Sequence, residues 1–250
     1  MSNHESYLAT IRQFYPEALP TSDAVDRMLT LLPRRFGLEP GQLMAADSIC
    51  SDDLNLIEYP KRAYEMLGPF KMGGLNGFPF TGLTGMGAFA HHVPADGAVF
   101  VFYGPHIGVS RAGVPGDVLR PGHSTPSACC GAAKAALGRL QRGEISPGHI
   151  TELDYQQNSI EQIFLAQGPR ILAAANPILE ATEVMYEAIE TRINLLAALT
   201  TYPCRYVILM GAILINADHE AGSFASHRRF EVLDSATGTS QNLLAEFLAA

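Results

Sequence analysis

The chain has 250 residues, of which 47% are hydrophobic and 17% charged, and its formal net charge is −8. This length suits a single domain with one large core. The negative charge disfavours a nucleic-acid surface, which needs clustered Lys and Arg, so we expect no nucleic-acid partner. No apolar run reaches the ~18 residues of a membrane helix, and the opening residues, MSNHESYLATIRQ, show no secretory signal. We therefore expect a soluble, cytoplasmic protein without membrane association, whose four cysteines are thiols or ligands rather than disulfides.

The first 45 residues are predicted to form a helical lead-in that packs on the main body. Thr21, Ser22 and Asp23 are typical N-cap residues, apolar positions follow at helical spacing, and Gly37 is suited to end the helix. Residues 66–90 are dense in glycine and almost uncharged. That composition predicts a buried loop rather than a helix or a flexible linker.

Strand and helix patterns alternate in the rest of the chain. Ala98–Tyr103 is a continuous apolar run suited to a sheet that is covered on both faces. A helix is predicted to open at residues 124–126 and to stop near Gly143. A longer helix carries an apolar stripe at Met185, Ile189, Ile193 and Leu196, and residues 205–217 read as one long or two short buried strands. Since no linker or repeat divides the chain, we predict a single α/β domain over residues 1–250, with its core from residue 46 onward.

Three places combine soft metal ligands with loop or element-end positions. They are Cys50, which is followed by Ser-Asp-Asp, His106 beyond the apolar strand, and the pair Cys129 and Cys130. Two thiolates and one imidazole form a ligand set that zinc favours, with the fourth position left for water or substrate. The spacing matches no short zinc motif, and a buried core cysteine is the ordinary alternative for each thiol.

One long block of sequence resembles a known family. The run GGLNGFPFTGLTGMGAFAHHVPADGAVFVFYGPHIGVS, followed by SACCGAA, is similar to the limiting-CO2-inducible B proteins, grouped as theta-class carbonic anhydrases. The likeness extends to Cys-Ser-Asp-Asp at residues 50–53 and to GAILIN, so it spans roughly residues 45–230. The resemblance implies a fold like that of the beta carbonic anhydrases, with a central, mostly parallel sheet flanked by helices, and a homodimer.

The resemblance also implies the residues of a zinc site. Its ligands fall on Cys50, His106 and Cys130; Cys130 is preferred to Cys129 because it directly precedes Gly-Ala, as the family's ligand does. Asp52 takes the place of the acid in the beta-type Cys-x-Asp-x-Arg motif, where it binds zinc in a closed state or orients the zinc-bound hydroxide.

Position 54 departs from that motif, because Leu54 stands where an arginine belongs. Without a cation, Asp52 could stay on the metal and block water, or serve only as a turn or cap residue. Lys61, Arg62 or Arg111 are the substitutes that we consider for the missing cation.

Several other residues of the block are candidates for the site. His91 or His92 could carry protons from the zinc-bound water, since imidazole titrates near neutrality; the ordinary alternative is one buried and one exposed ring. Other side chains are assigned as follows: Phe78, Phe80 and Phe89 as an apolar wall for CO2, Tyr103 and Ser110 as pocket lining or strand caps, His4, His149 and His227 as surface residues, and Cys204 as core.

The leading hypothesis is a zinc carbonic anhydrase, in which a zinc-bound hydroxide attacks CO2 to give bicarbonate. The main alternative is a zinc-binding homologue with little or no activity, acting as a binding or scaffolding protein. A dinucleotide site at residues 85–90 is disfavoured, because no strand precedes it and no acid follows about 20 residues on. A thiol-nucleophile enzyme using Cys129 or Cys130 with His106 as base is the remaining alternative.

Overall fold

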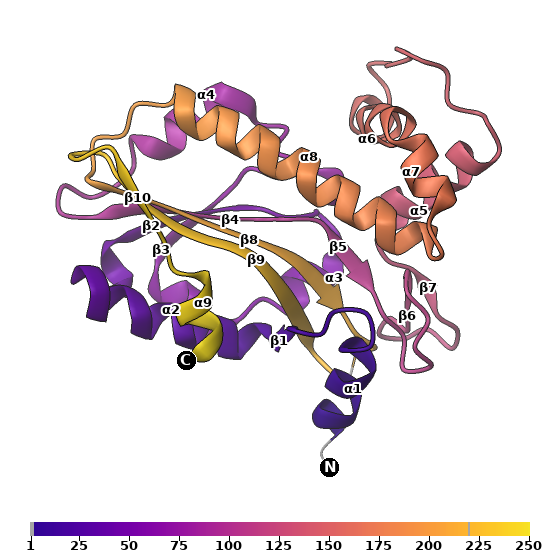
Figure 1. Ribbon diagram of the computed structural model, residues 1–250, viewed down its shortest axis with the longest axis horizontal. Helices are drawn as coiled ribbons and strands as arrows, with labels where there is room; N and C mark the ends of the chain where they lie inside the picture. Colours follow the sequence, from indigo (N-terminus) through magenta and orange to yellow (C-terminus); the bar gives the residue numbers. More distant parts are fainter. Residues whose placement is uncertain (1–2, 220) are drawn as a thin grey trace.

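A central sheet of eight strands organises the part of the chain that the computed structural model describes, residues 3–219 and 221–250, with side chains from residue 5 onward (Figure 1). The sheet order is β1-β9-β8-β4-β2-β3, with β10 added to β9 and β5 added to β8. Their bounds are Leu19–Pro20 (β1), Leu43–Ser48 (β2), Leu67–Lys71 (β3), Ala98–Tyr103 (β4), His106–Gly108 (β5), Tyr206–Asn216 (β8), Ser223–Asp234 (β9) and Thr239–Asn242 (β10). The pairs among β3, β2, β4 and β8, and between β5 and β8, are parallel, whereas β9 is antiparallel to its three neighbours. The fold is therefore mixed α/β with a mostly parallel sheet, as predicted.

Helices cover both faces of this sheet (Figure 1). The α-helices are Asn3–Ile11 (α1), Thr21–Phe36 (α2), Asp53–Ile57 (α3), Gly82–Ala90 (α4), Gly131–Gln141 (α5), Tyr155–Ala166 (α6), Gly168–Ala173 (α7), Pro177–Leu199 (α8) and Leu244–Ala249 (α9). A small separate hairpin is formed by β6 (Asp117–Val118) and β7 (Ser127–Ala128), and 3-10 turns cover Pro40–Gln42, Lys61–Glu65 and Leu75–Gly77.

The core has two main parts because side chains alternate across the strands. Along β4, Val99 and Val101 join a cluster with the apolar stripe of α8, whereas Phe100 joins a second cluster with Met28 and Leu32 of α2. Figure 1 shows α8 across one face of the sheet and α2 with α9 against the other. Both faces of the parallel strands are covered, which explains their continuous apolar sequences.

Several predicted elements are confirmed. β4 has the predicted bounds, α8 contains the predicted stripe, and residues 206–216 form one long strand. α2 ends at Gly37, whose φ of 67° is in the left-handed region that favours glycine. The lead-in is helical in α1 and α2, but it also supplies β1 and the start of β2 to the sheet.

Two predictions about elements are wrong. The glycine-rich residues 66–90 are not one loop, because they contain β3 and α4; α4 forms despite three glycines, and its Met86, Phe89 and Ala90 are buried. The helix predicted from residues 124–126 starts only at Gly131, because residues 127–128 pair with β6 instead. Residues 1 and 2 of the lead-in lie outside the described part.

Candidate metal centre

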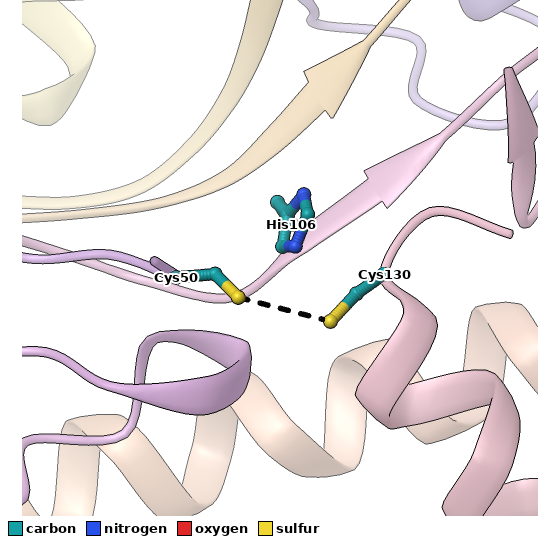
Figure 2. Close-up of side chains that lie close together, drawn as sticks. All are labelled: Cys50, His106 and Cys130. Carbon is teal, nitrogen blue, oxygen red and sulfur yellow. Dashed lines mark hydrogen bonds between the residues drawn. The ribbon is translucent and has the colours of Figure 1, made fainter. Parts of the chain in front are cut away.

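Cys50, His106 and Cys130 meet at the carboxyl edge of the parallel strands. Cys50 lies two residues beyond β2, His106 opens β5 just after β4, and Cys130 is the N-cap of α5. The ligand atoms of all three, which are buried, lie within 4.8 Å of one another (Figure 2). The carboxyl ends of parallel strands are where open α/β folds place their ligands, so the topology brings together residues that are far apart in sequence.

The geometry of this group fits zinc. The Sγ atoms of Cys50 and Cys130 are 3.9 Å apart. Two sulfurs, each about 2.3 Å from a tetrahedral zinc, would be about 3.8 Å apart. The Nε2 atom of His106 is buried and has no hydrogen-bond partner among the described residues, and a ring nitrogen in that state is available to a metal. The donor set and its spacing are therefore those of a three-ligand site.

Hydrogen bonds fix the orientation of the His106 ring. Its Nδ1 atom lies 2.8 Å from Oδ1 of Asn216, the last residue of β8. Because an amide oxygen only accepts, Nδ1 donates and Nε2 carries the free lone pair. This is the contact that commonly holds a metal-binding histidine in one tautomer. Asn216 was not singled out from the sequence, although it ends the GAILIN segment.

Without a bound cation, the surroundings of Cys50 disfavour its thiolate. The hydrogen bond with Cys130, followed by burial, raises the pKa of the Cys50 thiol well above its usual range. The Asn76 backbone N–H donates to Cys50 Sγ at 3.1 Å, and the Asn55 side chain donates to the Cys50 carbonyl at 3.1 Å. A divalent metal reverses the pKa shift by favouring the thiolate. For Cys130, the start of α5 directs its helix dipole towards the sulfur, which also favours the thiolate.

Cys129 forms a second possible group. Its sulfur lies within 4.8 Å of ligand atoms of Asp52 and His106. The Cys129 thiol also contacts Oδ1 of Asn216 at 3.5 Å and Nδ1 of His106 at 3.5 Å. It therefore lies on the Nδ1 side of the ring, where Asn216 Oδ1 already accepts the hydrogen bond from His106 Nδ1. Because Nε2 is the ring nitrogen that is free to bind a metal, and Cys129 lies on the other side of the ring, we favour the group with Cys50 and Cys130.

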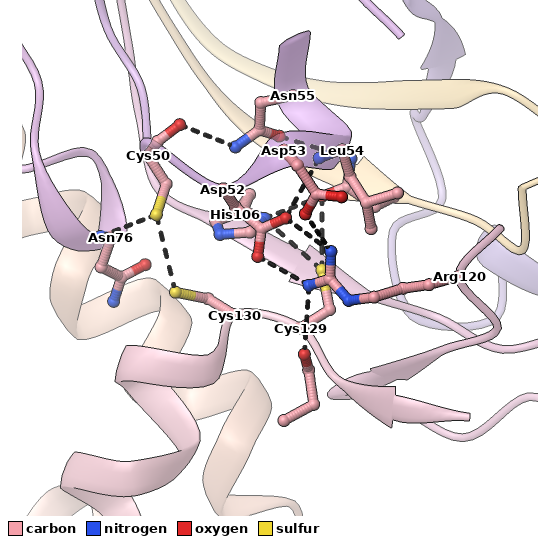
Figure 3. Close-up of polar contacts among 12 residues, drawn as sticks. Cys50, Asp52, Asp53, Leu54, Asn55, Asn76, His106, Arg120, Cys129 and Cys130 are labelled. Carbon is pink, nitrogen blue, oxygen red and sulfur yellow. Dashed lines mark hydrogen bonds and ion pairs between the residues drawn. The ribbon is translucent and has the colours of Figure 1, made fainter. Parts of the chain in front are cut away.

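Arg120 is the cation that pairs with Asp52, in place of the motif arginine that is missing at position 54. Its guanidinium donates two hydrogen bonds to the Asp52 carboxylate, at 3.0 and 2.7 Å, and also pairs with Asp53 (Figure 3). Burial opposes ionisation of Asp52, but the hydrogen bonds from Arg120 and the other favourable contacts outweigh it and lower the pKa of Asp52 to about 2. Asp52 also caps α3 by accepting the Leu54 N–H at 3.1 Å. The cap and the ion pair thus coexist.

None of the three cations considered from the sequence takes this place. Arg62 pairs with Asp26 and Glu65, Arg111 lies over the Tyr7 ring, and Lys61 is exposed. Leu54, which replaces the motif arginine, is buried in a small cluster with Val118 and Cys129. Arg120 comes from the loop between β6 and β7, 68 residues from Asp52, and no local pattern marks it.

The two histidines of the candidate set lie elsewhere. His91 and His92 follow α4 and are exposed, and α4 packs beside the C-terminal end of α8, away from β5 (Figure 1). The Nδ1 atom of His92 lies 2.6 Å from the Ala88 carbonyl oxygen, and His91 lines a shallow pocket with Leu199. The structure therefore brings Asp52 close to the candidate metal ligands, but it does not bring His91 or His92 into contact with them.

Other assigned residues divide between core and surface. Phe89 packs against Phe70, and Tyr103 donates to Glu190 of α8, so both serve the core. His149 is exposed and Cys204 is buried, as predicted, whereas His4 lies outside the described side chains. His227, predicted on the surface, is only 3% exposed; β9 places it inward, beneath Phe247 of α9.

A row of hydrogen-bonded polar side chains leads from the candidate metal ligands to the opposite side of the sheet. The Nδ2 atom of Asn216 donates to Glu58 Oε2 at 3.1 Å and to Asn55 Oδ1 at 3.3 Å. Burial is the main cause that raises the pKa of Glu58 to about 7. Asn76, whose side-chain amide is buried beside Cys50 without a partner in the described part of the chain, completes the polar surroundings (Figure 3).

Fold and site together define an α/β protein of the carbonic-anhydrase-like class with a buried Cys-His-Cys group that could hold a metal. The chain matches the family of limiting CO2-inducible proteins B/C beta carbonic anhydrases over residues 18–234, and it belongs to that family.

Solved structures agree with this membership. PtLCIB4, a homologue of the limiting CO2-inducible protein LCIB, has a TM-score of 0.83 at 29% identity, covering 94% of this chain and 98% of that one. A mutant of the same PtLCIB4 protein has a TM-score of 0.78 at 30% identity, with coverage of 94% and 98%. LCIB shares the fold at 18% identity, with a TM-score of 0.72 and coverage of 97% and 98%. No curated protein matches the chain, and no helix among the described residues is long and apolar enough to cross a membrane.

Proposed function

We propose that this protein is a zinc-dependent carbonic anhydrase that interconverts CO2 and bicarbonate. The observation that carries the proposal is the convergence of ligand atoms of Cys50, His106 and Cys130 within 4.8 Å of one another, together with a His106 Nε2 atom that has no hydrogen-bond partner among the described residues. Cys50 and Cys130 would hold the metal as thiolates, and His106 as a neutral imidazole positioned by Asn216. Zinc bound there would supply the Lewis acid that activates a water for attack on CO2.

Asp52 is proposed to be the acceptor that orients the attacking water. Its carboxylate stays ionised because Arg120 lowers its pKa, so it can accept a hydrogen bond throughout the neutral range. The two hydrogen bonds from Arg120 would also hold Asp52 back from a bound metal, which would leave a position free for the substrate. The free amide of Asn76 is available to the oxygen atoms of CO2 or bicarbonate.

The proton would finally leave to solvent. His91 and His92 are proposed as its carriers, but their distance from the ligands requires intervening water or buffer. Replacing both with alanine should therefore slow CO2 hydration at low buffer concentration and leave the rate at high buffer concentration nearly unchanged. An equal loss at both concentrations would contradict this role.

Stopped-flow CO2 hydration, with zinc content measured on the same sample, tests the function. Zinc-loaded protein should be active, and Cys50→Ala and His106→Ala should each lose both metal and activity. Cys204→Ala is a matched control, because Cys204 is a buried thiol of the core outside both candidate metal groups. Stoichiometric zinc without hydration above the buffer rate would remove the catalytic claim and favour a zinc-binding homologue with a binding or scaffolding role.

A further inference from the structure

A second internal space lies on the other side of Asn216 from the metal ligands. It is a cavity of about 80 Å³ between α2 and the sheet, and it includes Met28, Phe100, Phe102 and Met210 among its lining residues. Asn216 lines it as well, and the Nδ1 atom of His106 bonds to the oxygen of that same side chain. None of the three proposed zinc ligands lines the cavity, so it is distinct from the metal centre.

Buried polar atoms without partners line this cavity. His227 is one of its lining residues, is 3% exposed, and has no hydrogen-bond partner at either ring nitrogen among the described residues. Glu58 is another, and its Oε1 atom is likewise buried and unpartnered, although Oε2 accepts from Asn216. Such atoms are rare in folded proteins because each one left unsatisfied costs free energy. Their presence in one cavity points to a ligand that bonds to them.

The lining also restricts the chemistry of that ligand. No Lys or Arg of the described chain lines the cavity, and its walls are chiefly apolar, so an anion would be buried without a counter-charge beside Glu58. Burial lowers the pKa of His227 to about 3, so its ring is neutral and offers one donor and one acceptor. The volume is about half of the ~150 Å³ that holds benzene, which leaves room for about three to five non-hydrogen atoms.

We propose that this cavity is a binding site for a small, uncharged, mostly apolar molecule that carries one hydroxyl or carboxamide group. The apolar part fills the space between Met28, Phe100 and Met210. The polar group bonds to one ring nitrogen of His227 and to Glu58 Oε1, so two of the three unpartnered atoms gain a partner. The proposal goes beyond CO2 hydration and does not depend on it, because none of its contacts involves a metal ligand.

Isobutanol is a suitable probe because it has five non-hydrogen atoms and one hydroxyl. Titrated into the zinc-loaded full chain, it should shift the side-chain nitrogen resonances of His227 saturably in NMR spectra. Isobutylammonium has the same size and shape but a positive charge. At pH 6, where the Glu58 carboxyl is mostly protonated because its pKa is about 7, the cation has no counter-charge in the cavity and should bind at least about tenfold more weakly. Shifts of His227 that never saturate would mean that the cavity holds only water, and tighter binding of isobutylammonium would contradict an uncharged ligand.

Variants separate the apolar from the polar part of the proposal. Ala63→Leu places a larger side chain at the cavity wall and should weaken isobutanol binding at least about tenfold. Val25→Phe fills the cavity from α2 and should have the same effect, so it replaces Ala63→Leu if that variant does not fold. Ala95→Leu, at an exposed position, is the control and should bind as the parent does. His227→Phe keeps an aromatic ring without its nitrogens, and calorimetric titration should show a similar tenfold loss. Unchanged affinity in His227→Phe or in both filled variants would overturn the proposal.

Discussion

At the scale of single residues, the candidate metal centre is supported by side chains that are not themselves candidate ligands. Asn216 fixes the tautomer of His106, the Asn76 N–H supports the Cys50 sulfur, and Arg120 holds Asp52. Such supporting contacts usually determine ligand orientation and affinity. The geometry of the candidate site therefore depends on separate segments of the chain, and each can be tested by itself.

Replacing Arg120 with alanine should reduce CO2 hydration by about 10- to 100-fold. The variant loses two charge-assisted hydrogen bonds to Asp52, each worth about 1.5–3 kcal/mol, and frees the carboxylate to occupy the metal. Arg120→Lys should recover only part of the activity, because an ammonium group cannot form both bonds in the same plane. Steady-state hydration rates on zinc-loaded protein measure both effects.

Arg111→Ala is the control for this experiment. Arg111 is an exposed cation that lies over the Tyr7 ring and does not contact Asp52. It should retain the parent rate. Equal losses in the two alanine variants, or a rate within twofold of the parent for Arg120→Ala, would contradict the assigned ion pair.

Glu58→Gln should change how stability depends on pH. Below pH 4.5 the Glu58 carboxyl is protonated in both the folded and the unfolded state. Between pH 4.5 and about 7 the unfolded state releases this proton first, so the folded parent loses up to about 3 kcal/mol of stability, and the loss persists above pH 7. Glutamine cannot ionise, so the variant does not lose this stability as the pH rises. Urea denaturation at pH 5 and pH 8 measures the free energy of unfolding of both proteins. The variant should be more stable relative to the parent at pH 8 than at pH 5. The same difference between the two proteins at both pH values would contradict the raised pKa.

The sequence indicated the candidate ligands but not the residues that hold them in place. Cysteine and histidine are rare and chemically distinctive, and the family likeness fixed which of them to choose. Arg120 and Asn216 are ordinary residue types, and they reach the site only through contacts that span 68 and 110 residues. Their roles arise from tertiary structure, so no local pattern could show them.

At the scale of elements, a tight turn packs against the strand ends beside the candidate ligands. The 3-10 turn Leu75–Gly77 directs the Asn76 N–H at Cys50, and the Gly77 carbonyl accepts from Ser48 Oγ at 2.9 Å at the end of β2. Gly77 has a φ of 79°, and a Cβ atom there would collide with the Gly104 carbonyl that follows β4. Glycine at this position thus lets the turn approach the strand ends.

Gly77→Ala should destabilise the protein by about 2 kcal/mol or more, because it combines backbone strain with a steric clash against main chain. It should also weaken metal binding, since the turn that supports Cys50 must shift. Gly41→Ala is the matched control, because nothing lies within 4 Å of its added Cβ and its φ is ordinary. Urea denaturation and competition with a zinc chelator measure the two effects; a Gly77 variant as stable as the Gly41 variant would contradict the close approach.

Elements with strong periodicity were predictable, and those set by tertiary contacts were not. The apolar run of β4 and the stripe of α8 indicate their own structure. α4 is glycine-rich and forms because Met86, Phe89 and Ala90 are buried, so packing overrides its low propensity. Residues 124–126 look like a helix start, but residues 127–128 pair with β6, so α5 begins only at Gly131 with Cys130 as its cap.

At the scale of the whole molecule, we expect a homodimer in solution. Leu56, Ile57 and Tyr64 lie near the Asp52 end of the site in sequence, and each exposes more than half of its surface. Large apolar side chains gathered in one exposed segment are typical of an interface. Sedimentation equilibrium should give twice the mass of one chain, and Ile57→Glu should shift the equilibrium towards monomer. A single-chain mass at every protein concentration would contradict this expectation.

X-ray absorption at the zinc edge tests the central claim most directly, because it counts the sulfur ligands. The account predicts two sulfurs at about 2.3 Å and two nitrogen or oxygen ligands at about 2.0–2.1 Å, with one sulfur lost in Cys130→Ser and none in Cys129→Ser. A spectrum with one sulfur and three lighter ligands, unchanged in Cys130→Ser, would assign the metal to Asp52, His106 and Cys129 and contradict the account.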